Sequence, residues 1–175
     1  MAGGLKEVRE RIASVQNTMQ ITSAMKMVAA AKLRRAQDAI TRMRPYAEKL
    51  QAVLSNVSAS LDAGEGVFSE KREVKSVLYV AITSNRGLCG GFNNNIVKVV
   101  RSGMKQTDAN CHVLPLGKKA NDAFKNEAGL SPVGFDEDAW QVFDDLNFDR
   151  AQVVAEHIMA QFEGGQYDEV KIVYN

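Results

Sequence analysis

An uninterrupted heptad pattern over the first sixty residues limits what this chain can fold into more than any other feature. Alternate steps of three and four residues from Leu5 to Leu61 meet seventeen positions, fifteen of them apolar, and the register never slips. An apolar repeat of 3.5 residues held this long predicts a left-handed coiled-coil helix. The expected seam includes Val8, Ile12, Val15, Met19, Leu33 and Ile40.

A compact domain of this size has no place for such a rod. At about 1.5 Å per residue the segment extends roughly 85 Å, so it must project and be covered by a helix from elsewhere. Pro45 lies inside the pattern and predicts a kink or a short break near Arg44. Lys26 occupies a seam position among small residues, which favours close helix approach and sets the register.

Charge is distributed unevenly along the chain. Residues 1–50 hold ten Lys/Arg against four Asp/Glu, although the whole chain carries only +1. A basic arm on an acidic body predicts an acidic partner for the arm, and the overall balance does not indicate a nucleic-acid binder. The cluster of Lys32, Arg34 and Arg35 is either a hydrated helix face or a surface that meets acidic loops, and the asymmetry favours the second.

The remainder of the chain predicts a small α/β domain. Strands expected at 77–83, 111–116 and 169–174 alternate with helices expected at 93–105, 118–127 and 148–162. This order is typical of a Rossmann-like domain with a mainly parallel sheet. The predicted organisation is a shaft helix over 1–62, a linker over 63–75 and an α/β domain over 76–175.

The loop 84–93 follows the first strand and opens a helix, a position that often holds phosphate. Its glycines fit neither common phosphate-binding pattern, and no lysine is placed to reach a phosphate. The three glycines instead predict a tight turn with positive φ angles. Cys89 is predicted to be a small packed residue rather than an activated thiol.

No other motif indicates a catalytic or cofactor site. His112 and His157 are isolated, no paired carboxylates accompany them, and the acidic run 136–138 lacks the spacing of a calcium loop. We therefore expect neither metal nor cofactor. The two cysteines form no disulfide framework, and no apolar run approaches the roughly 18 residues that span a bilayer, so we expect membrane association only through partners.

Four segments, in order along the chain, resemble those of a known family. They are IASVQNT (12–18), ITSAMKMVAAAKLRR (21–35), RPYAE (44–48) and SNRGLCGGFN (84–93). By these motifs the chain resembles the gamma subunit of bacterial F-type ATP synthase. The similarity extends across the whole chain, although it is looser from 115 to 166.

The resemblance implies a central rotor shaft in the F1 sector, at the cytoplasmic side of the bacterial inner membrane. Such a shaft couples ion-driven c-ring rotation to conformational cycling of the catalytic beta subunits and has no catalytic residue of its own. Its implied partners are the alpha and beta subunits, the epsilon subunit and the c-ring. The resemblance places five residues against beta: Met25, Lys26, Lys32, Arg34 and Arg35. It places six others in a loop of the foot domain: Asn85, Arg86, Gly87, Leu88, Cys89 and Gly90.

Two departures from the family pattern affect what we expect. Asn85 stands where the family often has aspartate, and the family continues past residue 175 into a second long helix that pairs antiparallel with the first. We therefore expect a fragment that exposes its seam and self-associates through it. The alternatives are a coiled-coil adaptor with an α/β binding module and, less favoured by the motifs, a small Rossmann-like enzyme with a dimerising arm.

Overall fold

The computed structural model describes residues 3–60, 66–68, 72–126, 139–144 and 146–175. The chain divides into two compact units, Met1–Asp62 and Ala63–Asn175. The predicted linker over 63–75 lies partly outside the described residues and stays a prediction.

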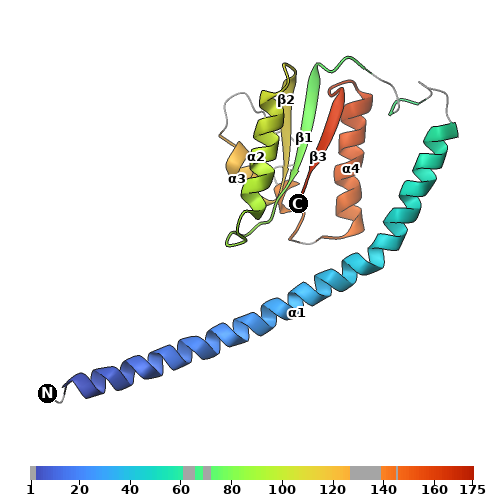
Figure 1. The fold of residues 1–175 in the computed structure, drawn as a ribbon. Coiled ribbons are helices and arrows are strands. Elements are labelled where there is room, and N and C mark those ends of the chain that lie inside the picture. The colour runs from blue at the N-terminus through green and yellow to red at the C-terminus, as the bar shows by residue number, and fades with distance from the viewer. Residues whose placement is uncertain (1–2, 61–65, 69–71, 127–138, 145) are drawn as a thin grey trace. The chain divides into compact units, whose positions relative to one another are not determined.

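The first unit is one α-helix, α1, which spans Gly3–Ser60 (Figure 1). Its 58 residues correspond to about 87 Å at the usual rise of an α-helix. The seam predicted from the heptad pattern therefore lies on a single continuous helix, up to Val57. Leu61, the last seam residue of the pattern, lies outside the described residues.

Pro45 lies inside α1 without ending it. A proline has no backbone N–H to donate and its ring crowds the preceding turn, so a bend is the expected response. Figure 1 shows α1 bending in its cyan part, the region that contains Pro45. The helix continues through this region, so a short break near Arg44, one of the two expected outcomes, does not occur.

The second unit is built on a parallel three-stranded sheet of order β2-β1-β3. The strands are β1 (Ser76–Ile82), β2 (Asn110–Leu116) and β3 (Glu169–Val173). The central β1 is buried on both faces, which explains its continuous apolar run. Tyr79 and its alternate neighbours pack on one side, while Leu78 and Val80 pack on the other.

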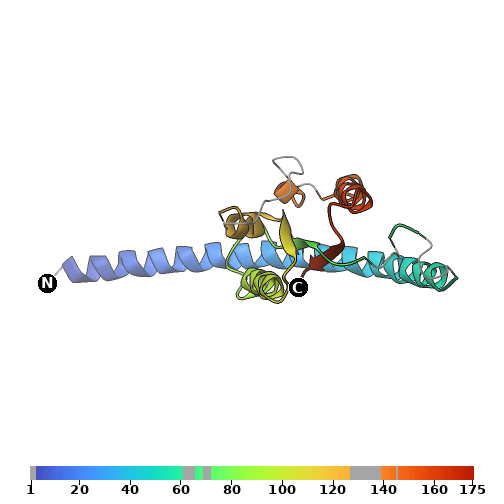
Figure 2. The same ribbon diagram turned by 90° about the horizontal axis from the view of Figure 1, so that it is seen from above.

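Helices cover both faces of this sheet, as Figures 1 and 2 show for α2 and α4. The elements α2 (Phe92–Lys105) and α3 (Lys118–Phe124) pack with Tyr79, and α4 (Phe148–Glu163) packs on the opposite face. Asn147 caps α4, because its side chain accepts a hydrogen bond from Arg150 N at 2.9 Å. The α/β class and the alternation of strands and helices are therefore confirmed.

Three details differ from the sequence-based expectation or fall outside the described part. The helix expected to reach residue 127 ends at Phe124, and a short 3₁₀ helix, η1 (Ala139–Gln141), had no signal in the pattern. The acidic run 136–138 lies outside the described residues.

The carboxyl ends of β1 and β2 are tied together at the start of the loop 84–91. Thr83 N donates to Leu116 O at 2.8 Å, and the buried Thr83 Oγ1 accepts from Ala120 N at 2.8 Å. Lys119 N also donates to Ser84 O at 3.2 Å. These bonds attach the first turn of α3 to the segment that leaves β1, and so fix where the loop begins.

Candidate functional site

The first candidate surface is the apolar face of α1. Its large apolar side chains are 46–67% exposed, whether or not they belong to the seam. The six seam residues predicted from the sequence all lie in this set: Val8, Ile12, Val15, Met19, Leu33 and Ile40. A helix with so many uncovered apolar side chains presents a surface suited to another helix.

Helix geometry separates the five residues expected to face a partner. Lys26 lies in the seam itself, and Met25 and Lys32 flank it in the heptad. Arg34 and Arg35 lie on the outer positions of the same helix. A helix seated on the seam would therefore cover the first three and leave the two arginines available to a different surface.

The second candidate surface is the loop 84–91 between β1 and α2, and Asn93 organises it. The Asn93 side chain is only 9% exposed; its Oδ1 accepts from Ser84 N at 3.0 Å. Its Nδ2 donates to Arg86 O at 3.2 Å and to Cys89 Sγ at 3.1 Å. A single buried amide thus fixes both ends of the loop, a role that the sequence did not reveal.

The turn of the loop uses a left-handed backbone at Leu88 as well as at Gly90, each with φ of 60°. The expected turn with positive φ angles is present, but of the three glycines of the loop only Gly90 contributes one, because Gly87 and Gly91 do not have positive φ. Leu88 is fully exposed at this position. An apolar side chain held out on a left-handed turn is unusual for an isolated surface and is suited to contact with a partner.

Asn85 ties the loop to two other segments. Its Oδ1 accepts from Lys118 N at 3.0 Å, at the start of α3, and its Nδ2 donates to Asp144 Oδ1 at 2.7 Å. An aspartate at this position could still accept the first bond but would place its other oxygen against the Asp144 carboxylate. An asparagine at position 85 therefore suits this contact better than an aspartate would.

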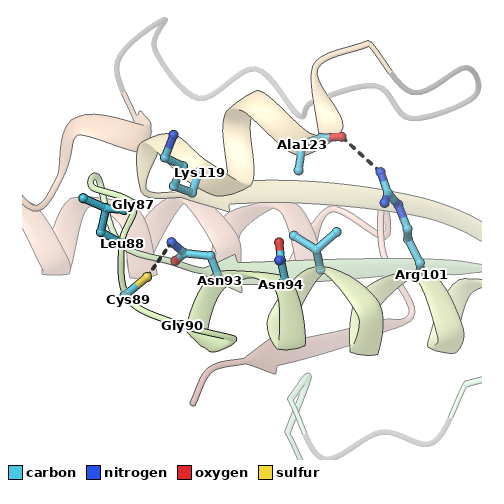
Figure 3. A pocket seen from close by; sticks show the side chains of 10 residues that line it. Gly87, Leu88, Cys89, Gly90, Asn93, Asn94, Arg101, Lys119 and Ala123 are labelled. Atoms are coloured by element: carbon cyan, nitrogen blue, oxygen red, sulfur yellow. Dashed lines mark hydrogen bonds between the residues drawn. The ribbon is translucent and has the colours of Figure 1, made fainter.

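Cys89 is exposed, so the prediction of a packed residue is wrong. The Asn93 amide aims at its sulfur (Figure 3), and Ser84 Oγ lies 4.0 Å from the same atom. The Asn93 amide thus holds the Cys89 side chain at the surface.

An open hollow of about 460 Å³ lies between this loop, α2 and α3 (Figure 3). Lys119 and Arg101 reach it from separate helices, and Lys119 Cε would lie 3.9 Å from a β-carbon at Gly87. A lysine beside the loop was not expected from the sequence, because Lys119 is distant from the loop along the chain. Arg101 lies over the Phe124 ring and donates to Ala123 O at 3.4 Å, while Lys119 is 3.9 Å from the Asp122 carboxylate.

Comparison with known proteins decides the family. A family model described as ATP synthase matches residues 4–175. The ATP synthase gamma chains of Flavobacterium psychrophilum and Christiangramia forsetii are 51% and 49% identical to this chain, over 98% of its length. The chain belongs to the ATP synthase gamma chain family.

The match holds for more distant members of the gamma chain family as well. The gamma chain of Chlorobium phaeobacteroides is 40% identical over 98% of this chain. In each of these three comparisons the chain spans 59% of the relative's own length. The resemblance inferred from the four motifs is thereby confirmed at the level of the family.

Two further findings concern metal binding and membrane spans. Among the described residues, no group of three or more His, Cys, Asp or Glu is arranged to hold a metal ion. None of the helices in the described part of the chain is long and apolar enough to cross a bilayer.

Proposed function

We propose that this chain is a central rotor shaft subunit of an F-type ATP synthase. In this role it couples ion-driven rotation of the c-ring to conformational cycling of the catalytic beta subunits. The observation that carries the proposal is α1, one helix of 58 residues with an exposed seam, in a chain that belongs to the gamma chain family. The helix is about 87 Å long, whereas a compact unit the size of the α/β unit has a radius of gyration of roughly 13 Å. The helix is therefore long enough to reach into a surrounding ring.

In this role the chain is a non-catalytic subunit. Nucleotide chemistry takes place on the alpha and beta subunits, and the shaft acts by presenting a different face to each of them as it turns. The subunit lies at the cytoplasmic side of the bacterial inner membrane, as a peripheral part of the complex, and reaches the membrane only through its partners. It binds no nucleic acid in this role.

The basic residues of α1 supply contacts with the beta subunits. Arg34 and Arg35 lie on outer positions of α1, so a helix on the seam would leave them available. Guanidinium groups pair with carboxylates in a bidentate manner, and charge complementarity fixes register between surfaces. Met25, Lys26 and Lys32 lie closer to the seam and contribute where the partner helix leaves them accessible.

The α/β unit acts as the foot of the shaft, with the epsilon subunit and the c-ring as its partners. Its charges are segregated: residues 84–125 carry seven Lys/Arg against two Asp/Glu, and residues 126–175 carry two against eleven. The basic part includes the loop 84–91 and the helices around the hollow. Two segments of opposite net charge suit a unit that must contact different subunits at once.

Assembly with alpha and beta subunits tests the proposal. The chain is mixed with both subunits, separately in its present form and in a form extended to the length of its relatives, and ring complexes are separated by size exclusion. We expect the extended chain to enter a complex with alpha and beta. Exclusion of the extended chain would favour the coiled-coil adaptor instead.

Charge reversal tests the residues assigned to beta. Arg34→Glu with Arg35→Glu is expected to weaken entry into the ring by at least about tenfold, since two charge-assisted pairs are replaced by repulsion. Arg150→Glu with Lys171→Glu makes the same charge change within the α/β unit and serves as the matched control. Equal losses for both double variants would mean that only net charge matters.

A further inference from the structure

We infer that the seam of α1 is built to receive a helix flanked by carboxylates, in preference to a second copy of this chain. The inference depends on where charges lie around the helix. With Leu5 taken as heptad position a, seam residues occupy a and d, positions e and g flank the seam, and b, c and f face outward. Because α1 is continuous from Gly3 to Ser60, these positions hold along its whole length.

Every charged residue on the two flanks is basic. Positions e and g carry Arg9, Arg11, Lys32 and Arg44, and the one charged seam residue is Lys26. The acidic residues of α1 are all on outward positions: Glu7, Glu10, Asp38 and Glu48. One of them, Glu10, lies 4.0 Å from Lys6, which is also on an outward position. The outward face thus mixes both signs, whereas the face that meets a partner helix carries only positive charge.

A second copy of α1 cannot satisfy these charges. In a parallel pair, residues at g meet residues at e five positions later, so Arg11 would meet Gln16 and Lys32 would meet Gln37. The two copies of Lys26 would also face each other in the seam. In an antiparallel pair, e positions meet e positions and g positions meet g positions, so each flanking cation meets a neutral residue or another cation, according to the register. Neither arrangement contains an attractive pair.

A helix with Glu or Asp at its own e and g positions would pair with all four flanking cations. Flanking ion pairs set partner choice and orientation in coiled coils. The apolar stripe alone still favours the self-association expected from the sequence, and the flanking cations oppose it. Self-association should therefore strengthen as salt screens the repulsion, while binding of an acidic helix should weaken.

This inference deepens the proposed function, since it rests on α1 being one half of a coiled-coil shaft, and it specifies the chemistry of the other half. Its test requires no ring. If the chain enters the ring but shows no preference for an acidic helix, only the inference fails. If it prefers the acidic helix but never enters the ring, the shaft proposal fails and the charge preference stands.

The experiment uses the whole chain and two synthetic helical peptides of roughly five heptads. Both have the same apolar seam, and they carry Glu or Lys respectively at every e and g position. Binding is measured by calorimetry at low and high salt, with self-association followed by sedimentation. At low salt we expect the Glu peptide to bind at least about tenfold more tightly than the Lys peptide, and the difference to shrink at high salt.

Two quadruple variants with the same change in net charge complete the test. The flank variant combines Arg9→Glu, Arg11→Glu, Lys32→Glu and Arg44→Glu, and it should reverse the preference in favour of the Lys peptide. The outward variant combines Arg34→Glu, Arg35→Glu, Arg42→Glu and Lys49→Glu, and it should keep the preference for the Glu peptide. Circular dichroism checks that α1 stays helical in each.

Three results would overturn the inference. One is self-association at low salt that is tighter than binding of the Glu peptide. Another is an outward variant that changes the preference as much as the flank variant does. The third is failure of the chain to bind either peptide, which would mean that the seam accepts no helix of this kind.

Discussion

The backbone of Gly117 lies directly against the carbonyl oxygen of Thr83, where β1 and β2 both end. A β-carbon at residue 117 would overlap that oxygen and lie 2.9 Å from Thr83 Oγ1, and the φ angle of Gly117 is 104°. Thr83 Oγ1 also receives the hydrogen bond from Ala120 N. The close approach of these two residues therefore determines how α3 begins and where the loop 84–91 is anchored.

Gly117→Ala should destabilise the α/β unit by about 3 kcal/mol, because it adds a backbone clash to an unfavourable φ angle. Urea unfolding followed by tryptophan fluorescence of Trp140 measures the change. Gly165→Ala is the control: its φ is 72°, but nothing lies within 4 Å of the added β-carbon. That variant should lose only about 1 kcal/mol, and equal losses at the two glycines would contradict the clash.

Asn85→Asp should destabilise the loop at neutral pH by about 1 kcal/mol, because the new carboxylate replaces the donor that faces Asp144. Repulsion raises the folded-state pKa of the pair. The loss should therefore be absent below roughly pH 4 and grow as the pH rises. Unfolding measured across pH reports it.

Asp144→Asn combined with Asn85→Asp provides the matched rescue. The double variant restores one donor and one acceptor between the two residues, with their roles exchanged. Stability at neutral pH should return to near the starting value. If the double variant is as unstable as Asn85→Asp alone, the contact between these residues does not decide the effect.

Asp168 should contribute an acid-sensitive part of the stability. Backbone N–H groups of Lys75 and Ser76 each donate to Asp168 Oδ2 at 2.9 Å, and these bonds hold the pKa of Asp168 below its ordinary value. A lowered folded-state pKa means that the contribution is present above the unfolded-state pKa and is lost as the pH falls through the folded-state value.

Asp168→Asn removes that titration, so its stability should depend less on pH in the acidic range. Thermal unfolding at a series of pH values compares the variant with the unchanged chain. Asp149→Asn, at the first turn of α4, is a control that leaves the entry to β1 untouched. A variant at 168 with the same acid dependence as the unchanged chain would exclude this role.

Pro45→Ala should straighten and stabilise the middle of α1. The alanine supplies a backbone N–H that can donate to the carbonyl of Thr41, which a proline at 45 leaves without that donor. Hydrogen exchange of the amides in the turn before residue 45 should slow by about tenfold. Ala47→Gly, in the same part of the helix, should have the opposite effect.

The sequence predicted α1 and the three strands because their signals are local and periodic. A heptad repeat defines a helix face without reference to the rest of the chain, and the apolar run at β1 reports burial on both faces. The basic residues at 32, 34 and 35 could likewise be assigned to one helix from sequence. Their division into flanking and outward heptad positions depends on the helix being continuous, and α1 is continuous from Gly3 to Ser60.

The loop and the hollow could not be predicted in this way. The outward position of Cys89 depends on a hydrogen bond from Asn93. Leucine is not a residue type that indicates a left-handed turn, so the positive φ of Leu88 could not be expected. Lys119 and Arg101 come together only because α2 and α3 pack on the same face of the sheet. Each of these features depends on contacts between segments far apart in the sequence.

The central position of β1 has a consequence during synthesis. Ser76, at the start of β1, is bonded to Asp168, just before β3, across 92 residues of chain. At a translation rate of about 5–20 residues per second, one edge of β1 stays without its neighbour for roughly 5 to 20 s after that strand has been made. Throughout this interval α1 and an open strand edge are both available to other nascent chains, so a chaperone bound in that window would protect the molecule at its most vulnerable stage.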